Sequence, residues 1–209
     1  MSKLLYIESS PRKDRSASIE VANSFIQAFT QANPNHQVET IDLWNLTLPE
    51  LNGELINAKY RILHGDDHSQ AEAQAWREVE KITAKFMAAD QYLFSIPMWN
   101  FSIPYKLKHY IDIVTQPSLT FSHSHQDGFK GLVTGKPATL IYARGGDYES
   151  IEASAMDFQQ PYMDMILGFI GFEEINSVFI EPTLTNPEAK ARVIAEAKER
   201  AIAFAGALA

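Results

Sequence analysis

The segment YLFSIPMWNFSIPYKLKHYIDIV, residues 92–114, runs from an apolar stretch through a turn into a helical pattern. Its first five residues have the length and composition of a buried strand, and the residues behind Pro104 carry apolar side chains at helical spacing. The turn between them is unusual, because turns mostly carry Gly, Asp and Ser, whereas this one carries Trp99 and Phe101. Such a turn either fills the core or holds a flat molecule, and the turn alone leaves both readings open.

The rest of the chain repeats this alternation of strand and helix. Strands are expected at residues 3–7, 38–43, 92–96, 138–143 and 175–180. Helices are expected at residues 18–29, after the capping box at 69–72, after Pro104, at 160–172 and after Asn186. Alternating strands and helices predict a parallel sheet that is covered on both faces. The expected fold is therefore α/β, a doubly wound five-stranded sheet in the order 2-1-3-4-5, in one domain spanning residues 1–209.

Composition excludes several classes of protein. The chain has 209 residues, of which 45% are hydrophobic and 21% charged, as in an ordinary globular domain. It has no cysteine, which excludes disulfides, thiolate metal sites and thiol nucleophiles. A net charge of −8 disfavours nucleic acid as a partner, and the lack of a long apolar run disfavours a membrane span. With no recognisable secretory leader, a cytoplasmic location is expected.

Three unusual loops follow the first, third and fourth expected strands. Ligands of open α/β sheets bind outside the carboxyl ends of the strands, so these loops should meet at one edge. The first loop contains Ser9, Ser10, Ser16 and Ser18 and runs into a helix N-terminus, which can bind an anion. One serine alone is better explained as an ordinary helix cap, but four in a single loop favour a phosphate. A dinucleotide site is not supported, because no G-x-G-x-x-G follows the first strand.

The other two loops suggest the rest of the ligand. Gly145 and Gly146 let the backbone approach a bound molecule closely, although two glycines could equally form a simple tight turn. Together with the aromatic turn and the serine loop they match a ligand with a phosphate tail and a planar polar ring. FMN fits this description; a simple nucleotide fits less well, because no metal–phosphate site is recognisable.

These motifs resemble those of the FMN-dependent NADH-azoreductases, also described as quinone reductases. The resemblance rests on the serine loop, the P-M-W-N-F turn at residues 97–101 and the R-G-G at residues 144–146, and it covers nearly the whole chain. It extends to the Thr120-Phe121 region, to G-L-V-T-G-K at residues 131–136 and to G-F-I-G at residues 168–171. The turn is the most specific of these motifs. Membership would imply a flavodoxin-like fold and a homodimer with an active site at each subunit interface.

The resemblance also assigns residues to the site. The FMN phosphate would be bound by Ser10, Ser16, Ala17 and Ser18. The isoalloxazine ring would lie against Met98, Trp99, Asn100 and Phe101, with Asn100 contacting its polar edge. The loop of Ala143, Arg144, Gly145 and Gly146 would approach the other end of the ring, and Phe121 would form the far wall of the substrate pocket across the dimer interface. Ala143 stands where relatives often have serine, and Ala17 replaces a polar residue of some relatives, so these two positions offer only backbone atoms.

The activity implied by the resemblance is hydride transfer from NADH or NADPH through one FMN per subunit to an acceptor, in ping-pong fashion. The acceptors would be quinones and aromatic azo compounds, the latter cleaved to amines. No catalytic side chain and no metal are expected, since the cofactor carries the chemistry. Two alternatives remain open: a non-enzymatic electron carrier of the flavodoxin type, and a nitro or metal-ion reductase on the same fold.

A few further residues and segments have simpler interpretations. His123 and His125 are expected in a solvated loop and His109 on the surface of a helix, whereas Trp44 and Trp76 are expected to be packing residues. The connections at residues 45–65 and 117–135 are expected to be long excursions that pack on a partner subunit.

Overall fold

A five-stranded parallel sheet forms the centre of the computed structural model, which describes residues 2–67, 69–124, 126 and 128–208. Its strands are β1 (Lys3–Glu8), β2 (Gln37–Asp42), β3 (Gln91–Pro97), β6 (Ala138–Ala143) and β7 (Ile175–Ile180). They lie in the order β2-β1-β3-β6-β7, and each neighbouring pair is parallel. The predicted fold class and strand order are therefore confirmed.

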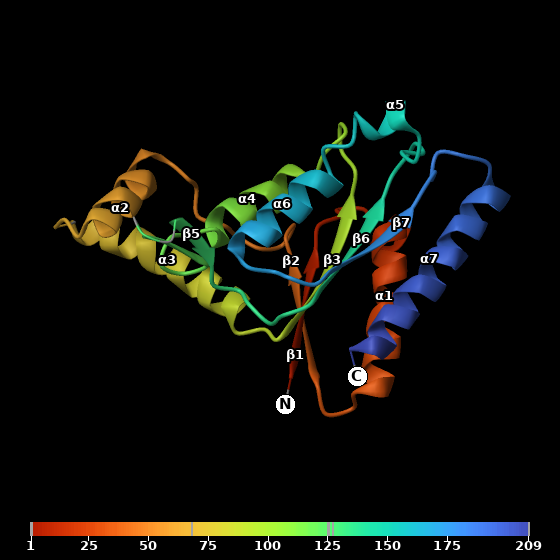
Figure 1. The fold of residues 1–209 in the computed structure, drawn as a ribbon, viewed down its shortest axis with the longest axis horizontal. Helices are drawn as coiled ribbons and strands as arrows, with labels where there is room; N and C mark the ends of the chain where they lie inside the picture. The colour runs from red at the N-terminus through yellow and green to blue at the C-terminus, as the bar shows by residue number, and fades with distance from the viewer. Residues whose placement is uncertain (1, 68, 125, 127, 209) are drawn as a thin grey trace.

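Helices cover both faces of this sheet (Figure 1). On one face lie α1 (Ala17–Ala32) and α7 (Pro187–Ala207), which pack together with the side chains of one face of the strands. On the other face lie α3 (Gln70–Met87), α4 (Tyr105–Val114) and α6 (Gln160–Ile170). The predicted capping box of α3 is present, with Ser69 and Glu72 each accepting a backbone hydrogen bond from the other. The central strands are buried on both faces, which explains why they read as continuous apolar runs.

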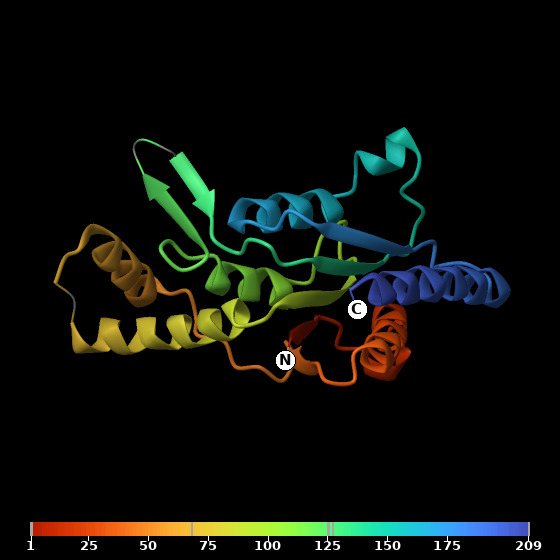
Figure 2. The same ribbon diagram turned by 60° about the horizontal axis from the view of Figure 1, so that its bottom comes forward.

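The two long connections contain secondary structure that the sequence patterns did not predict. The first holds α2 (Gly53–His64), which packs on α3 around the buried Trp76. The second holds an antiparallel hairpin of β4 (Phe121–Ser124) and β5 (Gly128–Gly131). A short helix, α5 (Ile151–Ser154), and a 3₁₀ turn at Lys13–Arg15 complete the elements. Figure 2 shows the α2–α3 pair and the hairpin extending away from the sheet on the same side of the molecule. None of the helices in the described part of the chain has the length and apolar character needed to cross a membrane.

The base of the hairpin is joined to the end of α6 by a very close backbone contact. Gly171 ends α6 in the left-handed region at a φ of 116°, and Val133 donates a backbone hydrogen bond to the Ile170 carbonyl at 2.9 Å. A Cβ on Gly131 would lie 2.3 Å from the Gly171 nitrogen and 2.4 Å from the Ile170 carbonyl carbon. Only a glycine fits at position 131, because the atoms it meets belong to the backbone and have no rotamer to change.

Gly131→Ala should therefore lower the free energy of unfolding by about 3 kcal/mol, since a methyl group forced against backbone moves the hairpin or the helix. Chemical denaturation of the two proteins measures this difference. Gly168→Ala is the matched control. It is also a glycine-to-alanine change, but it lies on α6, where nothing is within 4 Å of the added Cβ. It should stabilise the protein by roughly 0.5–1 kcal/mol. Equal stability of Gly131→Ala and the wild type would contradict the close contact.

Candidate functional site

The parallel register brings the three unusual loops to one edge of the sheet. At the end of β1, the backbone N–H and the hydroxyl of Ser9 both donate to the Ser95 carbonyl of β3, at 3.3 and 2.6 Å. At the end of β3, the N–H of Met98 donates to the Ala143 carbonyl of β6 at 2.8 Å. The serine loop, the aromatic turn and the glycine loop therefore start from neighbouring points, as the sequence predicted. Figure 1 shows this edge at the upper ends of the strands.

The serine loop delivers an anion-binding helix terminus to this edge. Ser16 is the N-cap of α1, and its side chain makes no capping hydrogen bond. Instead its hydroxyl lies 3.1 Å from the hydroxyl of Ser18, and both residues are buried, as is Ser10. The first-turn amides of a helix have no acceptor within the helix, so those of Ala17 and Ser18 are free to bind a ligand. Arg12 and Arg15 are exposed. Of the four predicted residues, Ser16, Ala17 and Ser18 thus lie together at the start of α1, and Ser10 is buried in the loop that leads to it.

Lys13 fixes the path of the serine loop. It has a φ of 49°, and its ammonium group bonds both to Glu8 at the end of β1 and to Asp42 at the end of β2, at 2.5 Å each. Burial works against the charge on Lys13, but the hydrogen bonds that it donates to these two carboxylates outweigh burial and raise the pKa of Lys13. Burial likewise opposes the charge on Asp42, yet the Lys13 ammonium and the Trp44 amide hold its pKa below the usual value. The loop is therefore tied to two strands by one cation.

The aromatic turn is a tight two-residue hairpin. Trp99 and Ser102 exchange backbone hydrogen bonds of 2.8 and 3.0 Å, while Asn100 and Phe101 between them have φ values of 48° and 68°. Two central residues with positive φ are characteristic of a type I′ turn. Asn tolerates this conformation, whereas for Phe it costs roughly 1–2 kcal/mol. Asn100 and Phe101 are both exposed, so the turn does not fill the core.

Aromatic rings from two other segments surround the turn. The ring centroid of Trp44, directly after β2, lies 5.7 Å from that of Trp99 and 5.6 Å from that of Tyr105. The Trp44 indole N–H also donates to the Ser9 carbonyl at 2.9 Å. Trp44 therefore links the serine loop to the aromatic turn, a role beyond the packing expected for it. Its place after a strand end was the signal that could have revealed this role.

A cavity of about 500 Å³ adjoins the turn. Its lining includes Trp99, Asn100, Tyr105, Lys108, His109 and Tyr162. His109, expected on the surface of a helix, is half-buried, and its Nε2 is 2.9 Å from the Pro49 carbonyl oxygen. The segment that follows β2 crosses α4 at this point, and helical periodicity alone does not reveal that contact.

In the glycine loop, residues 143–146, the Gly146 backbone is exposed, whereas the Arg144 side chain is buried. A Cβ on Gly145 would lie 2.8 Å from Leu184, and Gly146 is exposed. The Arg144 side chain is only 3% exposed and bonds to Asp157 at 2.7 Å and to Glu181 at 3.3 Å. Burial raises the pKa of Glu181, and the Arg144 guanidinium offsets only part of that rise. The Arg144 side chain therefore points toward Asp157 and Glu181 and away from the edge where the three loops meet.

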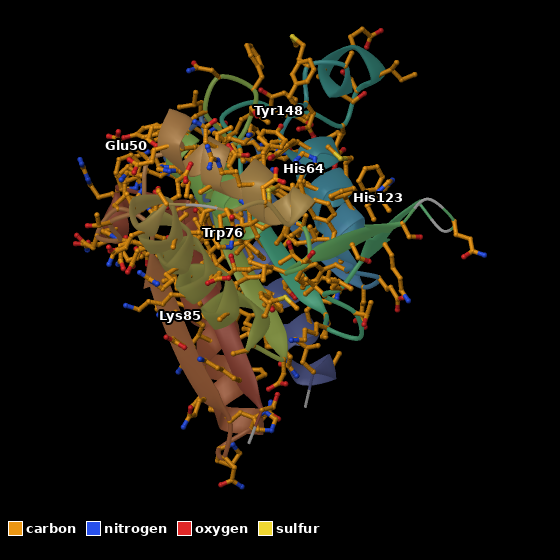
Figure 3. All side chains as sticks on the ribbon, turned by 90° about the vertical axis from the view of Figure 1, so that its left-hand side faces the viewer. Glu50, His64, Trp76, Lys85, His123 and Tyr148 are labelled. Atoms are coloured by element: carbon orange, nitrogen blue, oxygen red, sulfur yellow. The ribbon has the colours of Figure 1, made fainter. Side chains whose placement is uncertain are left out.

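Phe121 does not join these loops within one chain. Its ring lies 4.9 Å from that of Phe169 on α6 and 6.0 Å from that of Phe129 on β5. The His123 ring centroid lies 4.6 Å from that of Phe129, with the rings tilted by 49°. Figure 3 shows His123 on the projecting hairpin, apart from Tyr148 at the sheet edge. His125, predicted beside it, lies outside the described residues. These four rings, Phe121, His123, Phe129 and Phe169, are called the hairpin aromatic cluster below.

The fold and the edge site define a doubly wound α/β protein with a place for a phosphate-bearing ligand. The chain belongs to the family described as having a flavodoxin-like fold, whose model matches residues 2–204. It is 57% identical over 205 residues to an FMN-dependent NADH:quinone oxidoreductase of Desulfotalea psychrophila, with 98% of this chain and 97% of that protein covered. It is 45% identical over 203 residues to a protein of the same name from Nitratidesulfovibrio vulgaris, with 96% of this chain and 97% of that protein covered.

Solved structures agree with these relatives. An azoreductase of Bacillus anthracis has a TM-score of 0.90 at 28% identity, with 99% of each chain covered. An FMN-dependent NADH-azoreductase of the same species, solved in complex with FMN, has a TM-score of 0.86 at 26% identity, with 98% of this chain and 100% of that chain covered.

Replacing Lys13 tests the description of the serine loop. Lys13→Met leaves Glu8 and Asp42 near each other without their cation, so we expect a loss of about 1 kcal/mol in the free energy of unfolding at pH 7. The pKa of Asp42 is lowered in the wild type, so its stabilising contribution is present at neutral pH and lost as the pH falls through that pKa. The difference between the two proteins should therefore be smaller at pH 3.5 than at pH 7.

Urea denaturation at the two pH values measures both differences. Lys81→Met, on the exposed face of α3, is the control for removing one positive charge, and it should stay close to the wild type. A Lys13→Met deficit that grows toward pH 3.5 would be incompatible with the ion pairs.

Proposed function

We propose that this protein is an FMN-dependent oxidoreductase that moves hydride from NADH or NADPH to quinones and to aromatic azo compounds. The observation that carries the proposal is the buried hydroxyl pair of Ser16 and Ser18 at the N-terminus of α1, in the loop that Trp44 links to the aromatic turn. A helix N-terminus with added hydroxyl donors suits a phosphate, and exposed aromatic groups beside it suit a flat ring. The relatives at 57% and 45% identity carry names that state FMN, NADH and quinone.

The residues present fit FMN. Its phosphate would be held by the hydroxyls of Ser10, Ser16 and Ser18 and by the first-turn amides of α1, including that of Ala17. Its ring would lie against residues 98–101, with the Asn100 amide at a polar edge. The backbone at residues 143–146 would meet the other end, where Gly145 and Gly146 leave room for N–H groups to donate. Arg144 contributes to that loop from behind, since its side chain is occupied by Asp157 and Glu181.

Bound FMN supplies the hydride chemistry, because its ring can accept and release a hydride. The chain supplies position and electrostatics. The Gly145 and Gly146 amides are suited to steady negative charge on the polar edge of the ring. Trp99 and Tyr105 supply aromatic surface, and the cavity of about 500 Å³ that they line is large enough for a small aromatic acceptor. This cavity favours a reductase of small molecules over a carrier that only meets proteins.

A homodimer in the cytoplasm is part of the proposal. In each subunit the hairpin aromatic cluster projects beyond the sheet, and Phe129 is 64% exposed. A partner of the same sequence could cover these rings and bring Phe121 to the far wall of the substrate pocket. A pocket shared in this way would explain why Phe121 has no contact with the aromatic turn of its own chain.

The activity itself has a direct spectroscopic test. Purified protein, reconstituted with FMN if it is isolated without it, should have the visible spectrum of a flavin. Under anaerobic conditions NADH or NADPH should bleach the spectrum, and a quinone or an azo dye should restore it. Protein that takes up no FMN would refute the proposal, and flavin that is reduced by a protein reductase but by neither nicotinamide would favour the carrier.

The shared pocket predicts a different effect for Phe121. Phe121→Ala should lower kcat/KM for a quinone roughly tenfold, because a lost aromatic contact is worth about 1–1.5 kcal/mol, while the affinity for FMN stays unchanged. Ile202→Ala, an exposed apolar residue on α7, is the control. Sedimentation equilibrium should give twice the 23.5 kDa chain mass. A monomer that is fully active would contradict the shared pocket.

A further inference from the structure

The Arg144 guanidinium donates hydrogen bonds to three side chains behind the site. Its Nε donates to the Gln159 side-chain oxygen at 3.0 Å, its Nη2 to Asp157 at 2.7 Å and its Nη1 to Glu181 at 3.3 Å. The guanidinium carbon also lies 4.5 Å from the centre of the Phe179 ring. Two of these acceptors belong to one short segment, residues 157–159. Arg144 therefore joins the end of β6 to that segment.

The same segment holds the aromatic turn. The backbone N–H of Phe158 donates to the Phe101 carbonyl at 2.9 Å, and the hydroxyl of Ser102 donates to the Phe158 carbonyl at 3.2 Å. The Gln159 side-chain amide also donates to the Ile96 carbonyl, just before the turn, at 3.1 Å. The segment is thus bonded to Arg144 on one side and to the turn on the other.

The turn needs this support. Asn100 and Phe101 both have positive φ, a conformation that side chains other than glycine adopt reluctantly. The Phe101 ring is 48% exposed, so its burial compensates for only part of that cost. The hydrogen bonds between residues 101–102 and Phe158 hold the strained backbone from outside the turn.

We propose that Arg144 is a positioning residue: its bonds to Asp157 and Gln159 fix the segment that holds the 99–102 turn, and so set the wall against which the flavin ring lies. It acts from behind the site and does not touch the ligand. The inference rests on the proposed placement of FMN. It also gives the R-G-G motif two separate roles, because Gly145 and Gly146 face the ligand while Arg144 supports the turn.

The planar guanidinium is needed for this arrangement. It presents N–H groups in a fixed fork, so it can serve Asp157, Gln159 and Glu181 at once, whereas a lysine ammonium is a single point on a flexible stem. Arg144→Lys keeps the charge beside two buried carboxylates and should lose the geometry. Arg192→Lys, on the exposed surface of α7, makes the same chemical change away from the segment.

The first measurement is amide hydrogen exchange on the protein without FMN. Arg144→Lys should accelerate exchange at the Trp99 and Ser102 amides at least about tenfold, while the buried amides of β3 keep their wild-type rates. Arg192→Lys should change neither. A purely structural role would instead accelerate the slowest amides of the whole sheet together, and that result would overturn the proposal.

The second measurement is the affinity for FMN, followed by titrating the protein without cofactor. Arg144→Lys should weaken FMN binding about tenfold, and Ser102→Ala, which removes one bond to the segment, about threefold. The two residues do not touch each other, so independent effects would multiply. If both act through the segment, the double variant should bind FMN about as weakly as Arg144→Lys alone. Multiplying effects would overturn the proposal.

Asn100→Ala separates this inference from the placement of FMN. If Arg144→Lys and Asn100→Ala both bind FMN as the wild type does, the ring does not lie on the turn and the proposed site is wrong. If only Asn100→Ala binds more weakly, the site stands and the role of Arg144 is refuted. Should Arg144→Lys fail to fold, Asp157→Asn weakens the same link and keeps an oxygen for the Gln159 and Gln160 amides. The same outcomes then apply to it.

Discussion

The parallel pairing of β3 with both β1 and β6 is the constraint on which the rest of the site depends. In a parallel sheet the carboxyl ends of all strands lie at one edge. Loops that are far apart in sequence therefore begin next to each other when they follow neighbouring strands. Here the bonds from Ser9 to Ser95 and from Met98 to Ala143 join the three strand ends directly. Because the strands are buried on both faces, a slip of register would disturb both packed layers, so the loop positions are as firmly set as the core.

Two positively charged side chains, Lys13 and Arg144, support the loops of the site from behind. The chain is acidic, with a net charge of −8, yet the proposed ligand carries a phosphate. The α1 N-terminus and its buried hydroxyls can bind an anion without a nearby ammonium or guanidinium group, since the helix supplies oriented N–H donors. Lys13 and Arg144 hold loops instead, each by bonding to carboxylates from two segments. Because these two cations are bonded to carboxylates, they shape the loops and are not directed at the ligand.

The sequence predicts the elements whose apolar residues follow a regular pattern. Strands β1, β3 and β6 are recognisable because they are mostly apolar, and β2 because its residues alternate in character. Helices α1, α3 and α4 are recognisable because their apolar residues recur with helical spacing. The serine loop and the glycine loop could be located because each follows a strand end. What the sequence did not reveal depends on contacts between distant segments. Trp44, after β2, bonds to Ser9, and His109 on α4 contacts Pro49 of the same segment after β2. The direction of the Arg144 side chain is set by Asp157 and Glu181. Helix α2 buries only Leu55 and Ala58, so its apolar stripe is narrow, and each strand of the hairpin has only four residues. Both were missed for these reasons.

The central claim is that the α1 N-terminus holds the phosphate of a flavin. The most direct measurement compares the dissociation constants of FMN and riboflavin, which differ only in that phosphate, on the protein without cofactor. Charge-assisted bonds to buried donors should make FMN bind at least about 100-fold more tightly, a difference of roughly 2.7 kcal/mol. Equal dissociation constants for the two flavins would contradict the claim.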